Sequence, residues 1–544
     1  MSNGFKVPVP INEPIKDYAP NSKEKKSLVA KINELSSMKV EIPIIIDGKE
    51  IKTGNTGNCV KPYDHAHILG TYHKAGEEEV KMAIESSLDA WNDWSQTSFE
   101  FRAKIFLRMA ELLAGPYRDI INASTMLNMS KNAYQAEIDA ACELIDFWNF
   151  NCYYAEEIYK QQPMYSPEGT KNQTEPRPLE GFVFAVTPVN FTSIAANLPS
   201  APALMGNTAI WKPASSTVYP AHFIMQLFKE AGLPDGVINL LPGSGSIVGN
   251  QVLSHPKLAG IHFTGSTGVF QGMWKHIGQN INQYESYPRI VGETGGKDFC
   301  IAHESCNKQA LATAMTRGAF EFQGQKCSAM SRAYIPSTIW NDVKKIYFTQ
   351  INELKMGSPE HFSNFINSVI DQNAFDSITS YIDYAKDSDD AEIITGGQYD
   401  DSKGYFIEPT TILTTNPHFK TMEEEIFGPV LTIFIYNPED WDETLRLVDT
   451  TSPYALTGAI FCNDKEILQS ANKKLRFSAG NYYINDKPTG AVVGQQPFGG
   501  ARASGTNDKA GSMFNLIRWV SQRTIKENFE PPTDYKYPFM GEDE

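Results

Sequence analysis

Apolar side chains recur at helical spacing in the first 160 residues. Val80, Ile84 and Leu88 lie four positions apart, which predicts an amphipathic helix with one face packed into a core. A further helix is predicted over 136–159. The segment 160–178 that follows is polar and contains several prolines, so we expect it to form an exposed, extended arm.

The spacing changes after residue 180. Short apolar runs occur at 182–186, 208–211, 237–241 and 260–263. Segments of helix length separate the first three runs, and a shorter one precedes the fourth. Strands that alternate with helices form βαβ units and a parallel sheet. Because such crossovers are right-handed, the expected outcome is a doubly wound α/β domain.

The alternation continues beyond this sheet. Apolar runs and helical stretches alternate from 292 to about 500, which predicts a second α/β domain. A strand-like piece at 519–526 precedes a proline-rich tail. A terminal strand outside the main pattern is suited to pairing with another subunit, so we expect at least a dimer.

Composition and charge narrow the function classes. Hydrophobic residues make up 41% and charged residues 21% of the 544 residues, as in ordinary globular proteins. The net charge of −16 argues against nucleic acid or an anionic membrane as partner. No run approaches the length of a membrane-spanning helix. The N-terminus lacks the pattern of a signal peptide or presequence, so we expect a cytoplasmic location, or the mitochondrial matrix if a presequence was removed.

The seven cysteines predict no disulfide framework. Their number is odd, their spacing is irregular and none forms a CxxC pair, which favours free thiols in a reducing compartment. No cluster of His and Cys has zinc-ligand spacing, so we expect no metal site.

A glycine-containing turn is the first candidate for ligand chemistry. "FTGSTGVF" (263–270) follows a predicted strand and precedes a helix predicted from 271 to about 284. Backbone N–H groups and a helix N-terminus can approach a phosphate at such a junction. Lys212, in "WKPAS", lies at the carboxyl end of another strand, where open parallel sheets bind ligands.

Cys327 is the candidate nucleophile. It follows Gly324, Gln325 and Lys326, and we expect the lysine to lower the pKa of the thiol toward neutrality. A thiol can attack a carbonyl carbon, and the carboxylate of Glu293 beside a Gly-Gly turn can activate water. Each residue alone also suits a structural role, but together they indicate a thioester that forms and is hydrolysed.

The amide of Asn190, at the end of the first strand, completes this set. Its N–H groups can stabilise an oxyanion, an interaction worth about 3–4 kcal/mol in the transition state.

Seven short motifs occur in order along the chain: "TPVNF", "WKPAS", "FTGSTG", "ETGGKD", "GQKCS", "EEIFGPV" and "PFGG". Together they resemble the aldehyde dehydrogenase superfamily. The resemblance covers residues from about 40 to the C-terminus. Within the superfamily, 136–151 and 485–511 are similar to the pyrroline-5-carboxylate dehydrogenase branch.

The resemblance implies a role for each matching residue. It implies Cys327 as nucleophile, Asn190 as oxyanion donor and Glu293 as the base that activates water. The cofactor contacts that it implies are Pro188, Lys212, Ser215, Gly265, Ser266, Glu425 and Phe427. The substrate contacts are Ser328, Gly490 and Ala491 around a carboxylate, with Phe191 and Phe498 as aromatic walls.

The implied reaction is NAD-dependent oxidation of L-glutamate γ-semialdehyde to L-glutamate, the second step of proline catabolism. Ser215 stands where many NAD-preferring members have a carboxylate, which weakens the case for NAD over NADP. The alternatives are another ω-semialdehyde dehydrogenase and, from another class, a non-catalytic binding protein on this scaffold.

The resemblance also implies a division of the chain. It predicts a Rossmann-type doubly wound cofactor domain, an α/β catalytic domain and a small extended oligomerisation arm. The expected bounds are 1–159 for the N-terminal and helical part of the cofactor-binding domain, 160–178 for the first part of the arm, 179–291 for the NAD-binding domain, 292–512 for the catalytic domain and 513–544 for the C-terminal oligomerisation strand and tail.

Overall fold

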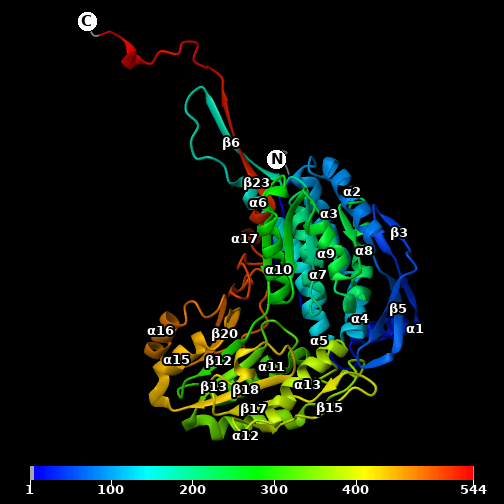
Figure 1. Ribbon diagram of the computed structural model, residues 1–544, viewed down its shortest axis with the longest axis vertical. Coiled ribbons are helices and arrows are strands. Elements are labelled where there is room, and N and C mark those ends of the chain that lie inside the picture. The colour runs from blue at the N-terminus through cyan, green and yellow to red at the C-terminus, as the bar shows by residue number, and fades with distance from the viewer. Residues whose placement is uncertain (1–4, 543–544) are drawn as a thin grey trace.

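The chain folds around two seven-stranded sheets, and the computed structural model describes residues 5–542 of it (Figure 1). The first sheet has the order β11-β10-β7-β8-β9-β2-β3: the first five strands are parallel, β2 pairs antiparallel with β9, and β3 pairs antiparallel with β2. Its strands are β7 (Phe182–Val186), β8 (Thr208–Lys212), β9 (Ile238–Leu240), β10 (Leu258–Thr264), β11 (Arg289–Glu293), β2 (Ile44–Ile46) and β3 (Lys49–Ile51). The four strands predicted from the apolar runs are confirmed.

The doubly wound arrangement follows from how strand side chains alternate. On β7, Phe182 and Phe184 pack in the cluster that contains residues of α2 (Glu77–Trp94), α9 (Gly245–Leu253) and α10 (Thr267–Gln279). Val183, between them, packs in the other cluster, with residues of α3 (Phe99–Ala114), α4 (Arg118–Met129), α6 (Glu143–Lys160), α7 (Thr192–Leu204) and α8 (Val218–Glu230). Successive side chains of a strand point to opposite faces, so helices cover both faces of this sheet. The predicted doubly wound sheet is therefore confirmed.

The second sheet has the order β14-β17-β18-β13-β12-β20-β21 and is parallel except for β14. Its strands are β12 (Asp298–Ala302), β13 (Met330–Pro336), β14 (Ala391–Thr395), β17 (Thr410–Thr414), β18 (Val430–Tyr436), β20 (Thr457–Phe461) and β21 (Asn481–Ile484). A second α/β layer after residue 292 is therefore present, as the alternation of apolar runs predicted.

Shorter strands complete the β structure. They are β1 (Val40–Ile42), β4 (Thr56–Lys61) and β5 (Asp64–His73) in one sheet, and the pairs β15 (Tyr399–Asp400) with β16 (Phe406–Ile407), β19 (Tyr454–Ala455) with β22 (Ala501–Arg502), and β6 (Thr170–Pro178) with β23 (Val520–Asn528).

The predicted helices are present, with different ends. The segment predicted as one helix over 136–159 consists of α5, a π-helical turn and α6 in direct succession. The helix predicted from 271 to about 284 begins earlier, because Ser266 already occupies the N-cap position of α10.

The helices are α1 (Lys23–Ser37), α2 (Glu77–Trp94), α3 (Phe99–Ala114), α4 (Arg118–Met129), α5 (Ala133–Ala136), the π-helix η1 (Glu137–Cys142), α6 (Glu143–Lys160), α7 (Thr192–Leu204), α8 (Val218–Glu230), α9 (Gly245–Leu253), α10 (Thr267–Gln279), α11 (Lys308–Phe320), α12 (Ser337–Glu353), α13 (Gln372–Lys386), α14 (Lys420–Glu423), α15 (Trp441–Thr450), α16 (Lys465–Lys474) and α17 (Met513–Leu516). The 3₁₀ turns are η2 (Ser215–Thr217), η3 (Ile281–Gln283), η4 (Glu321–Gly324), η5 (Pro438–Asp440), η6 (Ile517–Trp519) and η7 (Pro538–Met540).

A two-stranded ribbon projects from the body of the molecule (Figure 1). It consists of β6 and β23, paired antiparallel from Val520 opposite Pro178 to Asn528 opposite Thr170. The strand predicted at 519–526 is thus confirmed, and its partner is the predicted arm of the same chain. Within 5–542, no helix is both long and apolar enough to cross a membrane.

Candidate functional site

Two cavities meet at the side chain of Cys327. The larger, of about 660 Å³, lies along the first sheet, and the smaller, of about 270 Å³, lies on the side of α6 and the loop 488–496. Cys327 lines both of them. The two spaces are called below the sheet cavity and the helix cavity, and the loop 488–496 the anchor loop.

Segments that leave the carboxyl ends of parallel strands form the sheet cavity. Pro188 and Asn190 follow β7, Lys212 ends β8, and Gly265 and Ser266 follow β10. Glu425 and Phe427 reach the cavity from the loop before β18. Of the seven predicted cofactor contacts, six line this cavity. Ser215 does not, because the chain turns into η2 after Pro213 and leaves Ser215 exposed.

Two charged side chains face the sheet cavity. Burial lowers the pKa of Lys212 and raises that of Glu425 to about 7. Glu425 accepts a hydrogen bond of 2.9 Å from the backbone N–H of Gly296. A lysine and a carboxyl group at the carboxyl edge of a parallel sheet can bind hydroxyl groups of a ligand.

The Gly-Gly turn after Glu293 is required by close approach. A Cβ at Gly295 would lie 2.3 Å from a carboxylate oxygen of Glu425, and one at Gly296 would lie 2.3 Å from the carbonyl oxygen of Cys327. A side chain at Gly295 would displace the Glu425 carboxylate, and one at Gly296 would clash with backbone. The two glycines therefore allow this turn to pack closely against Glu425 and the backbone of Cys327.

Cys327 follows a turn of unusual backbone conformation. Phe322, Gln323 and Gly324 have φ angles of 51°, 55° and 66°, in the left-handed region. The amide of Gln323 donates to the carbonyl of Ser368 (2.8 Å) and thereby holds the turn. Such strain persists only where the surroundings determine it, and it is frequent at active sites.

The predicted effect of Lys326 on the thiol is wrong. Burial raises the pKa of Cys327 well above its ordinary value, and the charges of Glu293, Asp298 and Glu425 add to this. The Lys326 ammonium lies 3.5 Å from Glu321 and 3.9 Å from Asp139, so it forms ion pairs with these carboxylates. The loop is also buried.

Asn190 lies beside the nucleophile loop. It is buried, and its Nδ2 donates a 3.1 Å hydrogen bond to the carbonyl of Gln325, two residues before Cys327. An amide carries two N–H donors, so one remains for an oxyanion at the thiol.

Glu293, the last residue of β11, lies outside the walls of both cavities. It faces a small hollow that Lys509 also lines. Burial raises the pKa of Glu293 to about 8, and its Oε1 has no hydrogen-bond partner within the described part of the chain. The charge of Glu293 adds to the raised pKa of the Cys327 thiol. A buried carboxyl group with a pKa near neutrality suits a general base.

All five predicted substrate contacts line the helix cavity: Phe191, Ser328, Gly490, Ala491 and Phe498. The hydroxyl of Ser328 lies 2.8 Å from that of Thr489. Gly490 has φ 96°, and a Cβ there would lie 2.8 Å from the Lys487 ammonium. The anchor loop therefore requires glycine at this position.

Sequence reasoning missed the charged residues of the helix cavity. Burial raises the pKa of Glu143 to about 8, and Ser193 donates a hydrogen bond to it. Lys487 donates to the carbonyl of Thr489 (2.9 Å). The segment 136–151 was recognised as typical of the family but was interpreted only as a helix. Its acidic residues at positions 139, 143 and 146, three or four apart on one helix, were the available signal.

The comparisons with known proteins agree with this geometry. A model of the aldehyde dehydrogenase family matches residues 50–525. The chain belongs to the aldehyde dehydrogenase family. This membership confirms the fold that the motifs implied.

Individual relatives are similar over nearly the whole chain. A protein of Dictyostelium discoideum named delta-1-pyrroline-5-carboxylate dehydrogenase, mitochondrial, is 51% identical over 98% of this chain and 96% of its own length. A protein of Agaricus bisporus named delta-1-pyrroline-5-carboxylate dehydrogenase is 48% identical over 98% of each chain. The crystal structure of the delta-pyrroline-5-carboxylate dehydrogenase from Mycobacterium tuberculosis bound with NAD is 49% identical and has a TM-score of 0.96, covering 99% of this chain and all of that one.

Within residues 5–542, no three or more His, Cys, Asp or Glu side chains are grouped so that they could hold a metal ion. All seven cysteines are unpaired and buried.

Proposed function

We propose that this aldehyde dehydrogenase oxidises L-glutamate γ-semialdehyde, the open form of pyrroline-5-carboxylate, to L-glutamate with NAD⁺. The observation that carries the proposal is the position of Cys327 in the wall shared by two cavities. One cavity can then hold the cofactor and the other the aldehyde, on opposite sides of the thiol. Several relatives named pyrroline-5-carboxylate dehydrogenase support the choice of substrate.

The sheet cavity fits a dinucleotide. It lies at the carboxyl ends of β7, β8 and β10 and meets the N-terminus of α10 at Ser266, where a phosphate is favoured. Lys212 and Glu425 would hold ribose hydroxyls, and Pro188, Gly265 and Phe427 would line the bound cofactor. The similar structure from Mycobacterium tuberculosis is bound with NAD, which supports NAD here. When bound, the nicotinamide supplies the hydride acceptor.

In the acylation half of the reaction, the thiol of Cys327 loses its proton to solvent, and the sulfur then adds to the aldehyde carbon. Asn190 Nδ2 and the backbone N–H of Cys327 donate to the oxygen that becomes negative. The carbon–hydrogen bond then breaks with loss of hydride, the C=O bond reforms, and Cys327 carries a thioester.

In the deacylation half, Glu293 removes a proton from water, which attacks the thioester carbon and releases the thiol and the acid. One aldehyde, one NAD⁺ and one water give one acid, one NADH and one proton. Because Glu293 lies in its own hollow, we propose that its side chain turns toward Cys327 for this step.

The helix cavity suits an amino acid aldehyde. Ser328 and the backbone N–H groups of Gly490 and Ala491 would bind the α-carboxylate, and Phe191 and Phe498 would enclose the chain. The cavity also contains acidic and basic side chains, among them Glu143 and Lys487. A substrate with both a carboxylate and an ammonium group complements such a lining.

The division of the chain remains our proposal. We assign the first sheet to cofactor binding and the second to catalysis, with the predicted bounds. The β6–β23 ribbon would bind a second copy of the chain, since unpaired strand edges favour association.

For the cellular compartment we propose the cytoplasm. The alternative is the mitochondrial matrix, which the name of the Dictyostelium relative supports.

The test is NADH formation on a panel of aldehydes. We expect the highest kcat/KM with glutamate γ-semialdehyde, a lower value with succinic semialdehyde and the lowest with hexanal. A higher value with succinic semialdehyde would favour another ω-semialdehyde dehydrogenase. Absence of NADH with every aldehyde would favour a binding protein.

A further inference from the structure

The first described residues lie against the helix cavity without forming a helix or strand. Asn12, Glu13 and Ile15 line the cavity, while Val7 and Tyr18 at either end of the segment are buried. Residues 7–18 are called below the N-terminal strap. A segment without secondary structure needs other partners for its backbone N–H groups.

Three carboxylates from the α5–α6 helical stretch supply these partners. Glu137 accepts from the N–H of Lys16 (2.9 Å), Asp146 from that of Glu13 (2.8 Å), and Glu156 from that of Val7 (3.2 Å). As the residue number rises along the helices, it falls along the strap. The strap therefore runs antiparallel to the helices along a row of acceptors.

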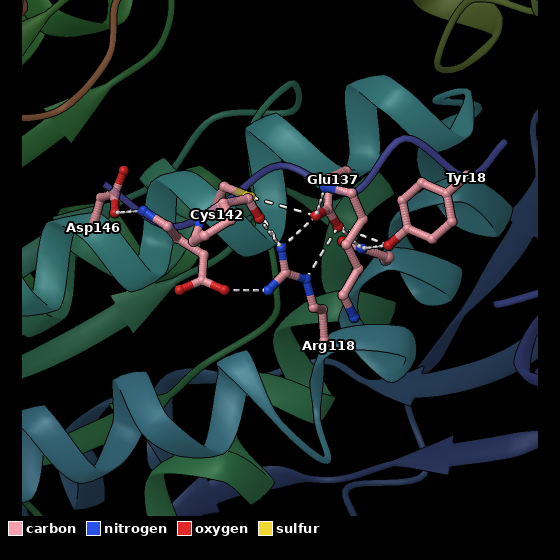
Figure 2. A network of polar contacts seen from close by, with 9 residues as sticks. Tyr18, Arg118, Glu137, Cys142 and Asp146 are labelled. Carbon is pink, nitrogen blue, oxygen red and sulfur yellow. Dashed lines mark hydrogen bonds and ion pairs between the residues drawn. The ribbon is translucent and has the colours of Figure 1, made fainter. Parts of the chain in front are cut away.

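Arg118 fixes the C-terminal half of the strap. Its guanidinium forms ion pairs with Glu13 and Glu137 and donates to the carbonyl of Pro14 (2.8 Å). The hydroxyl of Tyr18 donates to Glu137 (2.7 Å). Figure 2 shows Glu137 bonded both to Arg118 and to Tyr18, with Asp146 farther along the helices. Charge-assisted hydrogen bonds of this kind are about twice as strong as neutral ones.

The strap also contacts the anchor loop. Asn12 Nδ2 donates to the carbonyl of Val493 (2.7 Å) and to Asp146 (2.8 Å), while its Oδ1 accepts from Gln495 (2.9 Å). One side chain thus joins the helical wall of the cavity to the loop that contains Gly490 and Ala491.

We propose that the N-terminal strap positions the anchor loop, with Asn12 as the positioning residue, and so sets the affinity for the carboxylate end of the substrate. The proposal rests on the proposed function, because it assumes that this loop binds the α-carboxylate. Asn12 touches no reacting atom and acts through Val493 and Gln495.

The first test is Asn12→Ala, measured by steady-state kinetics. The KM for glutamate γ-semialdehyde should rise about fivefold to tenfold, as expected when the two neutral hydrogen bonds to the anchor loop are lost. The kcat and the KM for NAD should stay within about twofold, because the strap does not line the sheet cavity. The KM for hexanal, which has no carboxylate, should change by less than about twofold.

Ile11→Ala is the matched control. Ile11 is the adjacent strap residue and is 81% exposed, so its removal should leave all constants unchanged. If Asn12→Ala matches this control, or if both aldehydes suffer equally, the proposal is wrong. Wild-type kinetics on glutamate γ-semialdehyde test the proposed function alone, whereas the ratio of variant to wild-type KM tests the strap.

Gln495→Ala removes the hydrogen bond between Gln495 and Asn12 from the loop side. It also tests the proposal if Asn12→Ala does not fold. It should raise the KM selectively for glutamate γ-semialdehyde. In the double variant the increase should be smaller than the product of the two single increases, because the residues share a hydrogen bond. A fully multiplicative effect would show that Asn12 does not act through Gln495 and would contradict the proposal as stated.

Discussion

The sheet cavity and the helix cavity share Cys327 but are built in opposite ways. Among the described residues, the sheet cavity has two charged lining side chains, Lys212 and Glu425. Backbone turns and small residues after parallel strands form most of its wall. The helix cavity has charged residues from four separate parts of the chain, at positions 13, 139–146, 317–326 and 487.

The difference shows which part of the enzyme depends on topology and which on individual side chains. A parallel sheet creates a crevice at its carboxyl edge whatever its side chains are. A charged pocket exists only where each buried charge has a partner or a ligand. We therefore expect substitutions in the helix cavity to change substrate choice, and substitutions in the sheet cavity to change cofactor binding.

The largest effect is expected from the residue common to both cavities. Cys327→Ala should lower kcat by several orders of magnitude, because no covalent intermediate can form. Binding of NAD, measured by calorimetry, should persist. Cys306→Ala, at a buried thiol outside both cavities, is the control and should keep its activity. Retention of more than a few per cent of activity in Cys327→Ala would contradict the assignment.

Glu293→Gln should separate the two halves of the reaction. Loss of a general base typically costs about 100-fold or more. Stopped-flow absorbance should show one equivalent of NADH in a burst, and mass spectrometry of the intact protein should show the thioester. Normal steady-state turnover without an adduct would make Glu293 a structural residue.

The pH dependence follows from the raised pKa of Glu293, about 8. Protonated Glu293 cannot remove a proton from water. The steady-state rate of the wild-type enzyme should therefore rise about tenfold per pH unit well below pH 8 and level off above it. The measurement is steady-state NADH formation from pH 6 to 9.5. A flat profile across this range would contradict a role for Glu293 in the rate-limiting step.

Ser328→Ala probes the helix cavity alone. It removes one hydrogen bond to a carboxylate, so the KM for glutamate γ-semialdehyde should rise about tenfold. The KM for hexanal and that for NAD should change much less. Equal losses on both aldehydes would remove Ser328 from the carboxylate anchor.

Lys212→Ala is the counterpart in the sheet cavity and should have the smallest effect. The variant lacks the proposed contact to the ribose hydroxyls of NAD. Its KM for NAD should therefore rise several-fold, while its KM for the aldehyde stays unchanged. A matched measurement with NADP tests cofactor choice. Equal efficiency with both cofactors would refute the preference for NAD.

The contrast between the cavities also explains what the sequence could predict. Apolar runs identified four strands of the first sheet, β7 to β10, because local pattern determines them. The seven proposed cofactor contacts came from the family resemblance, and six of them line the sheet cavity. The effect of Lys326 was mispredicted because burial raises the pKa of the thiol and because Lys326 pairs with Glu321 and with Asp139, which is distant in the sequence. Asn12 gave no signal, since its contacts lie at Asp146, Val493 and Gln495.

The β6–β23 ribbon has a consequence for synthesis on the ribosome. The whole second sheet lies between its two strands in the sequence, so β6 emerges long before its partner. At a synthesis rate of about 5–20 residues per second, β6 waits roughly tens of seconds. During that time its backbone edge is open to other nascent chains. Chains on neighbouring ribosomes of one messenger can therefore compete with β23 for β6. Pairing at the ribbon would then determine whether chains associate correctly or incorrectly.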